Sequence, residues 1–123
     1  LLASSAASDV YKRQDYYEGL AAHYTHMKEL FCGGLKNLGF TFTEPQGAYY
    51  VLMDVSEFGV KDDVKFCEWM TEHVGVAAVP GSSFFREDVH NLIRFHFAKK
   101  DETLNAALDN LAALRAKADG FKE

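Results

Sequence analysis

The stretches Val79–Phe85 (VPGSSFF) and Asn91–Ala98 (NLIRFHFA), joined by a short polar loop, decide how this chain folds. Pro80 ends an extended segment, because proline cannot continue the interior of a strand. The apolar run after the loop has the composition of a further strand. Two strands joined by one short loop pair in antiparallel fashion. This part of the chain therefore predicts an antiparallel sheet.

Arg94 stands at the centre of the second of these strands. Alternation places it on the same face as His96, whereas the opposite face is wholly apolar and is expected to contact the helices. An arginine in an apolar strand is costly unless it is paired or lines a ligand cavity. Its planar fork fits a carboxylate through two parallel hydrogen bonds. Two partners remain open: a carboxylate of the protein, for instance Asp54, or the carboxylate of a substrate.

Apolar periodicity and capping residues predict three helices and three strands. The helices are expected at residues 15–38, from Asp62 or Asp63 to Gly75, and from Asp101 to Gly120. The strands are expected at residues 48–55, 76–79 and 92–98. The first strand is almost wholly apolar, which predicts burial on both faces or nearly so. The order α-β-α-β-β-α predicts an α+β fold, a two-layer sandwich with helices packed on a small, mostly antiparallel three-stranded sheet.

Residues 1–14 (LLASSAASDVYKRQ) differ from the rest of the chain. They show no amphipathic period, their paired leucines are too short for the apolar core of a signal peptide, and no initiator methionine precedes them. The run ASSAASDVYKRQ is similar to the read-through of a sequencing-library adaptor. We therefore expect residues 1–14 to be disordered and non-native. A disordered natural linker is the alternative.

Length, charge and cysteine content limit the class of protein. A chain of 123 residues with 48% hydrophobic residues is expected to form one domain. Its net charge of −5 and the lack of a basic stretch argue against nucleic acid or an anionic membrane as the main partner. No apolar run approaches the roughly 20 residues that span a bilayer. Cys32 and Cys67 lie far apart in apolar patterns, which predicts reduced buried thiols and a cytoplasmic location.

The motifs of common catalytic sites are lacking in this sequence. The turn Gly81–Ser83 is not a nucleophile elbow, and the phosphate-loop and dinucleotide fingerprints are absent. His23 and His26 have the spacing of half a metal site. No third ligand stands near them, so no metal site is predicted. Arg94 remains the best candidate for a functional residue.

The order of these features resembles a known family. The motif Pro45-x-Gly47, the segment Val79–Ser82 and the strand arginine Arg94 follow one another between a first helix ending in LGF and a last helix beginning with DETL. This arrangement is similar to the C-terminal small domain of class I/II aminotransferases, fold type I enzymes that use pyridoxal 5'-phosphate (PLP). The resemblance covers residues 15 to about 117. Each motif alone is weak, but the combination is specific.

The resemblance implies roles for parts of the chain. Arg94 would bind the α-carboxylate of an amino-acid or 2-oxo-acid substrate. Residues 15–123 would form the small domain, with residues 15–38 as the long helix between it and a missing large PLP domain, and the parent protein would be a homodimer. The Schiff-base lysine and the PLP-binding residues of the family map upstream of Asp15. This chain alone is therefore expected neither to hold PLP nor to transfer an amino group.

Two other functions remain open. A PLP-dependent C–S lyase or related synthase shares the fold and the carboxylate-binding arginine. An independent α+β binding module without enzymatic activity is the other alternative. Such a module predicts no exposed apolar face, whereas an isolated small domain predicts an apolar patch along the long helix. The sequence does not define which amino acid and which 2-oxo acid would react.

Overall fold

The computed structural model describes the backbone of residues 2–85 and 87–123 and the side chains of residues 13–85 and 87–123. Its helices and strands, in chain order, are α1 (Leu2–Asn37), β1 (Thr41–Thr43), β2 (Tyr50–Asp54), α2 (Asp63–His73), β3 (Val79–Pro80), β4 (Leu92–His96), α3 (Asp101–Leu111) and α4 (Leu114–Lys117). Short 3-10 turns occupy residues 56–58, 81–83 and 118–120. The four strands form one sheet in the order β1-β2-β4-β3, and every neighbouring pair is antiparallel.

The sheet and the helices form two layers, as expected for the α+β sandwich. One face of the sheet is buried, with Val51, Met53, Ile93 and Phe95 each at most 3% exposed. These side chains join one apolar cluster with residues from the three longer helices: Met27, Phe31, Leu35, Phe66, Met70, Leu104 and Leu111. The removal of these apolar side chains from water is the main force that stabilises such a domain. The predicted fold class is confirmed.

The sheet contains four strands, and the prediction of three is wrong. The additional strand is β1, which pairs with β2 through Thr41↔Asp54 and Thr43↔Leu52. The predicted burial of β2 on both faces is also wrong, because Tyr50 is 41% exposed while its neighbour Val51 is buried. An apolar strand sequence does not by itself separate a doubly covered strand from one with an open face. The open face is the one that carries Arg94.

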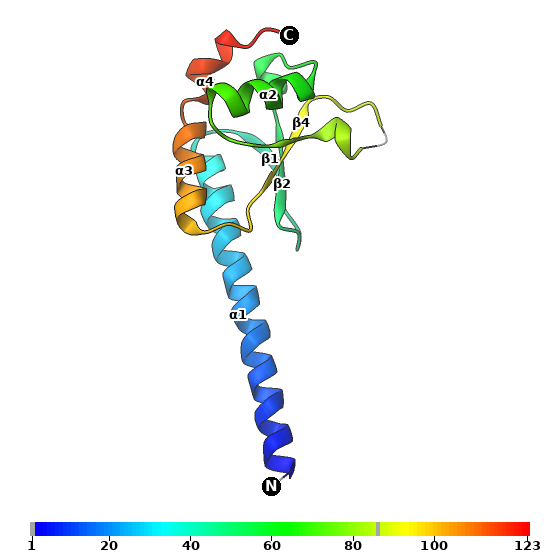
Figure 1. Ribbon diagram of the computed structural model, residues 1–123, viewed down its shortest axis with the longest axis vertical. Helices are drawn as coiled ribbons and strands as arrows, with labels where there is room; N and C mark the ends of the chain where they lie inside the picture. The colour runs from blue at the N-terminus through cyan, green and yellow to red at the C-terminus, as the bar shows by residue number, and fades with distance from the viewer. Residues whose placement is uncertain (1, 86) are drawn as a thin grey trace.

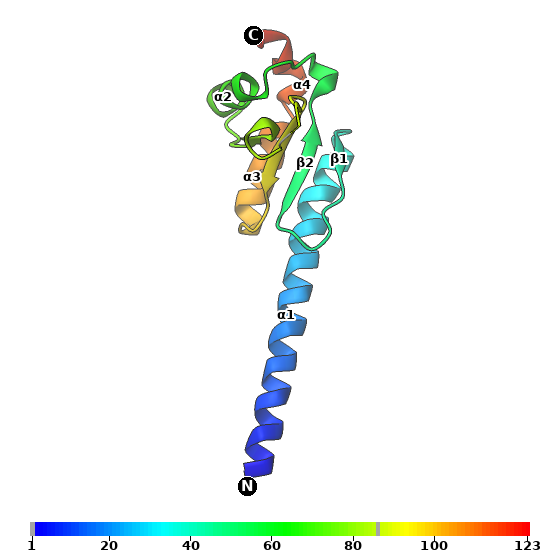
Figure 2. The same cartoon turned by 90° about the vertical axis from the view of Figure 1, so that its right-hand side faces the viewer.

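Helix α1 is longer than predicted. The sequence places its start at Asp15, but the structure describes one continuous helix from Leu2. Residues 2–14 are therefore helical rather than without regular structure; residue 1 lies outside the described part. Alanine and leucine have the highest helix propensities, and no proline or glycine interrupts this run. Figure 1 and Figure 2 show the N-terminal half of α1 standing clear of the rest of the domain.

The C-terminal helix predicted as one segment is broken into two. Helix α3 ends at Leu111, and α4 begins at Leu114. Both leucines are fully buried, and the change of direction between them lets the tail return over α2. There Phe121 lies 5.2 Å from Phe66, measured between ring centroids. Tertiary burial has outweighed the helix propensity of the alanines at the break.

Helix α2 begins at the predicted place. Asp62 is its N-cap, and the Asp62 carboxylate accepts a hydrogen bond from the backbone N–H of Lys65 at 3.2 Å. Gly75 ends this region in the left-handed conformation with φ +80°, and its N–H donates to the Met70 carbonyl. The start and stop signals of α2 in the sequence were therefore sufficient.

Replacing Asp62 by alanine should destabilise the chain by about 1 kcal/mol, because an N-cap acceptor at the start of α2 is lost. Urea denaturation followed by circular dichroism measures the change. The exposed Asp109, in the last turn of α3, caps no helix N-terminus and provides the aspartate-to-alanine control. Equal stability of the Asp62→Ala and Asp109→Ala variants would show that the cap contributes nothing.

Candidate functional site

Arg94 lies at the middle of β4, between Leu52 of β2 and Val79 of β3. Its side chain is partly buried on the open face of the sheet. The guanidinium carbon lies 4.8 Å from the ring centroid of Tyr50 and 4.7 Å from that of Phe84. Two aromatic contacts restrict the side-chain rotamers through cation–π attraction, while the hydrogen-bonding edges of a planar guanidinium point away from its faces. The site thus presents an oriented donor fork.

The alternative partner Asp54 is engaged elsewhere. Its carboxylate accepts hydrogen bonds from the Ser56 backbone N–H at 2.8 Å and from the Asn91 side chain at 3.2 Å. Burial would raise the pKa of Asp54, but these donors outweigh it and lower the pKa below 3.8. Among the side chains that the structure describes, Arg94 forms no ion pair. Within the described residues, an intrachain salt bridge therefore does not account for Arg94.

The turn before β4 is held by a buried carboxylate. Asp63, at the first position of α2, has no exposed surface. It accepts hydrogen bonds from the backbone N–H of Ser82 at 2.7 Å and from the Ser82 hydroxyl at 2.9 Å. His90 Nδ1 lies 3.4 Å from the same carboxylate, and the other ring nitrogen contacts Asp88. These contacts tie the loop between β3 and β4 to the start of α2.

The contacts of this cluster shift two pKa values. Burial would raise the pKa of Asp63, but the donors from Ser82 and His90 outweigh burial and hold it below its ordinary 3.8. Hydrogen bonds to Asp88 and then to Asp63 raise the pKa of His90 above its ordinary 6.5. The folded chain therefore favours a carboxylate at Asp63 and an imidazolium at His90.

The stability of the chain should depend on pH on both sides of a plateau. A lowered carboxyl pKa contributes stability above pH 3.8, which is lost as the pH falls through the folded-state pKa of Asp63. A raised imidazole pKa contributes stability below pH 6.5, which is lost as the pH rises through the folded-state pKa of His90. Urea denaturation between pH 2.5 and 9 measures both limits. The His90→Gln variant should lose the alkaline decline and keep an acid decline, because the Ser82 donors to Asp63 remain. An unchanged alkaline decline would contradict this assignment.

The turn Pro45–Gly47 lies on the same side of the sheet as Arg94. The hydroxyl of Tyr24, from α1, accepts the Gly47 N–H and donates to the Ala48 carbonyl, each at 3.0 Å. A shallow hollow of about 200 Å³ separates this turn from β2, and Tyr50 and Leu52 line it. Tyr50 also contacts Arg94. Two of the motifs singled out in the sequence are thus brought to one face.

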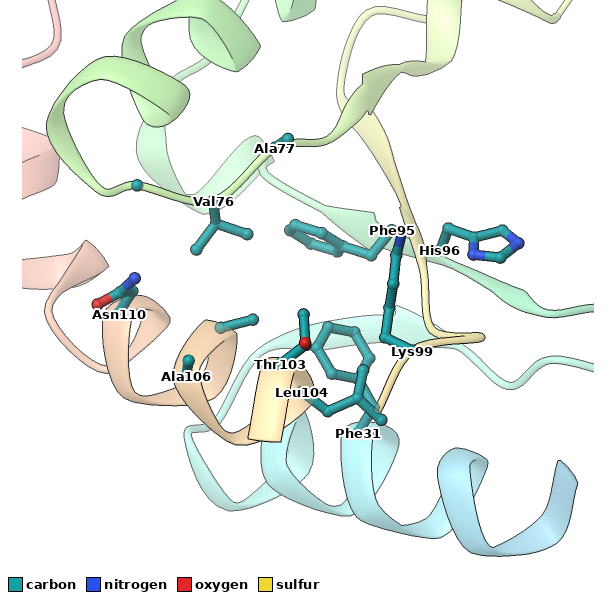
Figure 3. A pocket seen from close by; sticks show the side chains of 12 residues that line it. Phe31, Val76, Ala77, Phe95, His96, Lys99, Thr103, Leu104, Ala106 and Asn110 are labelled. Carbon is teal, nitrogen blue, oxygen red and sulfur yellow. The ribbon is translucent and has the colours of Figure 1, made fainter. Parts of the chain in front are cut away.

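A larger groove of about 270 Å³ lies on the other side of the sheet. Figure 3 shows Phe31, Val76, Phe95 and Leu104 around it, with the ring of His96 pointing away. Its lining is mostly apolar, and no set of charged groups converges in it. This groove is separate from Arg94. Its lining includes His96, Lys99 and Thr103, but within the described residues no hydrogen bond joins them into a nucleophile–base pair.

The histidines of α1 and the two cysteines make contacts that are typical of structural rather than functional residues. His26 contacts Asp101 at 2.8 Å rather than His23, and within the described residues no three histidine, cysteine or acidic side chains form a metal-binding group. Cys32 and Cys67 are buried and free. Their thiol pKa values are raised to about 11 and about 12, and burial is the largest cause. Of the helices described, none has the length and apolarity needed to cross a membrane.

Comparisons with known proteins place this chain in one family. The family model described as aminotransferase class I and II matches residues 1–111. This chain belongs to the class I and II aminotransferases. A methionine aminotransferase of Escherichia coli (strain K12) is 35% identical over 114 residues, which are 91% of this chain and 30% of that protein. An aspartate aminotransferase of Thermotoga maritima is 43% identical over 77 residues, 63% of this chain and 19% of that protein.

Solved aminotransferase structures share the fold. A methionine aminotransferase structure from Escherichia coli gives a TM-score of 0.75 at 36% identity and covers 82% of this chain and 27% of the other. The structure of N-succinyldiaminopimelate aminotransferase from Mycobacterium tuberculosis gives a TM-score of 0.74 at 31% identity. It covers 83% of this chain and 27% of the other. The chain thus spans less than a third of the length of these relatives. The fold predicted from the aminotransferase resemblance is confirmed.

Aminotransferases of this family are PLP-dependent, but the residues present do not fit the cofactor. A Schiff-base lysine needs an enclosed site with partners for the pyridine nitrogen and the phosphate. Each lysine whose side chain is described is exposed, except the partly buried Lys28, which contacts Glu44 at 3.8 Å. No described lysine stands in such a site. The described residues of this chain therefore offer no site that would hold PLP.

Proposed function

We propose that this aminotransferase-family chain is the small domain of an enzyme that transfers the amino group of an amino acid to a 2-oxo acid. In that enzyme Arg94 binds the substrate α-carboxylate. The observation that carries the proposal is a partly buried guanidinium, held by Tyr50 and Phe84, to which no described carboxylate is paired. The shared chemistry of both substrates at this position is a carboxylate next to the reacting carbon.

Arg94 would act by binding and orienting. Two parallel, charge-assisted hydrogen bonds fix the plane of a carboxylate as well as its position. The aromatic contacts reduce the rotamer freedom that the side chain would lose on binding. PLP, held by the rest of the enzyme, supplies the electron sink of the reaction. Orientation of the reacting carbon toward that group is the contribution of this domain.

We propose residues 15–123 as the small domain and residues 15–38 as the connection to the PLP-binding part. Tyr16, Tyr17 and Leu20 are 63%, 65% and 41% exposed on the projecting half of α1. An apolar patch of this kind is expected where the large domain or a second subunit of a homodimer packs. Two buried free thiols support a cytoplasmic location.

An assay of the full-length protein tests the proposal. L-Methionine with 2-oxoglutarate is the first pair to use, since relatives include methionine and kynurenine–oxoglutarate aminotransferases. The expected products are glutamate and the 2-oxo acid of methionine in equal amounts, and a panel of amino acids then defines the preferred donor. Release of ammonia and a thiol would instead identify a C–S lyase. A lack of turnover and of PLP absorbance across the panel would favour a binding module.

A further inference from the structure

Capping of helix α2 does not explain why the Asp63 carboxylate is buried. Among the residues described, it is the one charged side chain that is buried. The N-cap of α2 is its neighbour Asp62, so Asp63 is not needed to satisfy the first turn. Both Asp63 carboxylate oxygens point instead to the loop before β4, where they accept the Ser82 N–H and the Ser82 hydroxyl. A buried carboxylate is tolerated only with such donors.

The loop that Asp63 holds is in direct contact with the strand of Arg94. A Cβ atom at Gly81 would lie 2.7 Å from the Leu92 carbonyl oxygen, so this turn and β4 are in close backbone contact. Phe84, two residues after Ser82, places its ring 4.7 Å from the Arg94 guanidinium carbon. Any shift of the turn therefore moves one of the two aromatic rings that orient Arg94.

We propose that Asp63 is a positioning residue for carboxylate binding: it fixes the Gly81–Ser83 turn so that Phe84 holds the Arg94 guanidinium ready for the substrate. This inference rests on the proposed role of Arg94. Asp63 does not touch the substrate. Its effect is preorganisation, which lowers the conformational cost of binding and leaves the chemical step unchanged.

Variants of two adjacent aspartates test the inference in the full-length holoenzyme. Asp63→Asn should raise the KM for L-methionine about tenfold and change kcat less than twofold, because the carboxylate is bound less well while chemistry is unaffected. Asp62→Ala is the matched control, since it removes the α2 cap without touching the turn. Its KM should stay within about twofold of the wild type. An equal rise in KM for the two variants would overturn the inference, because destabilisation of α2 would then explain it.

A double variant, Asp63→Asn made in the Arg94→Ala enzyme, separates this inference from the proposed function. If Asp63 acts through Arg94, Asp63→Asn should cause no further rise in KM in the Arg94→Ala enzyme. A further tenfold rise there would overturn the inference while the role of Arg94 stood. If Arg94→Ala alone leaves the KM and kcat/KM for L-methionine unchanged, the proposed function fails instead.

A milder variant and a spectroscopic measurement cover the case in which Asp63→Asn does not fold. Ser82→Ala removes only the hydroxyl donor to Asp63, and it should raise the KM in the same direction by about threefold. In a 15N-arginine-labelled sample, ring currents of Tyr50 and Phe84 should displace the Arg94 side-chain resonance. Ser82→Ala should reduce that displacement and Asp62→Ala should not. An unchanged KM and resonance in Ser82→Ala would overturn the inference.

Discussion

Replacing Arg94 by alanine in the full-length enzyme should lower kcat/KM for its amino-acid substrate by about 10²–10⁴-fold. Each hydrogen bond to a charged group contributes about 1.5–3 kcal/mol, and the bidentate pair supplies two of them. A factor of ten in rate corresponds to about 1.4 kcal/mol. Arg94→Lys keeps the positive charge but loses the fork and the stacking on Tyr50 and Phe84. Its activity should lie between those of the alanine variant and the wild type.

Steady-state kinetics with L-methionine and with 2-oxoglutarate measures the effect on both half-reactions. Arg115→Lys is the matched control, because Arg115 also stacks on an aromatic ring, that of Phe40 at 4.6 Å. Arg115 donates to the Leu38 and Gly39 carbonyls, so its substitution should affect stability and leave the KM unchanged. PLP absorbance should stay unchanged in the Arg94 variants. Wild-type kcat/KM in Arg94→Ala would exclude the carboxylate role.

Replacing Gly81 by alanine should destabilise the chain by about 1–3 kcal/mol and also weaken carboxylate binding. The new Cβ would meet the Leu92 carbonyl oxygen at 2.7 Å, and neither backbone segment can move alone, because Ser82 is bonded to Asp63. The backbone at Gly81 does not have a positive φ. Steric overlap with β4, rather than backbone strain, is therefore the cause.

The same glycine-to-alanine substitution at Gly33 should have the opposite effect on the stability of the chain. A Cβ at Gly33, inside α1, meets nothing within 4 Å, so alanine should stabilise the chain by up to about 1 kcal/mol through its helix propensity. Urea denaturation of both variants measures the contrast, and the KM of the full-length Gly81→Ala enzyme measures the effect on the site. Equal stabilities for the two variants would show that the turn and β4 are not in rigid contact.

The fold was predicted where local signals and burial agree. Asp62 caps α2 and Gly75 ends it, and the alternation around Arg94 matches its burial, with Ile93 and Phe95 at most 3% exposed. The predictions of helix bounds were wrong where tertiary contacts or the continuity of a helix outweigh local signals. Asp15 and Glu18 form the pattern of a capping box, yet the helix passes through them. The break after Leu111 depends on burial of Leu114 and Phe121 against distant residues, which periodicity alone does not report.

The candidate site was predicted only in part. Arg94 was identified because a charge in an apolar strand is unusual, and the Pro-Gly-Ser-Ser turn because of its composition. Tyr50 and Phe84 were not identified, since their contacts with Arg94 depend on the register of β2 with β4 and on the conformation of the loop. Asp63 was considered only as a helix start. The second aspartate of an Asp-Asp pair is the signal that was available, because one residue suffices for the cap.

The most direct measurement compares two substrates that differ only in the carboxylate. 3-(Methylthio)propylamine is L-methionine without its carboxylate, and kcat/KM for both compounds is measured with the wild-type enzyme and with Arg94→Ala. If Arg94 binds the carboxylate, the variant should lose about 10²–10⁴-fold in kcat/KM for L-methionine and little for the amine. An equal loss for both substrates would contradict the account, because Arg94 would then support the site without recognising the carboxylate.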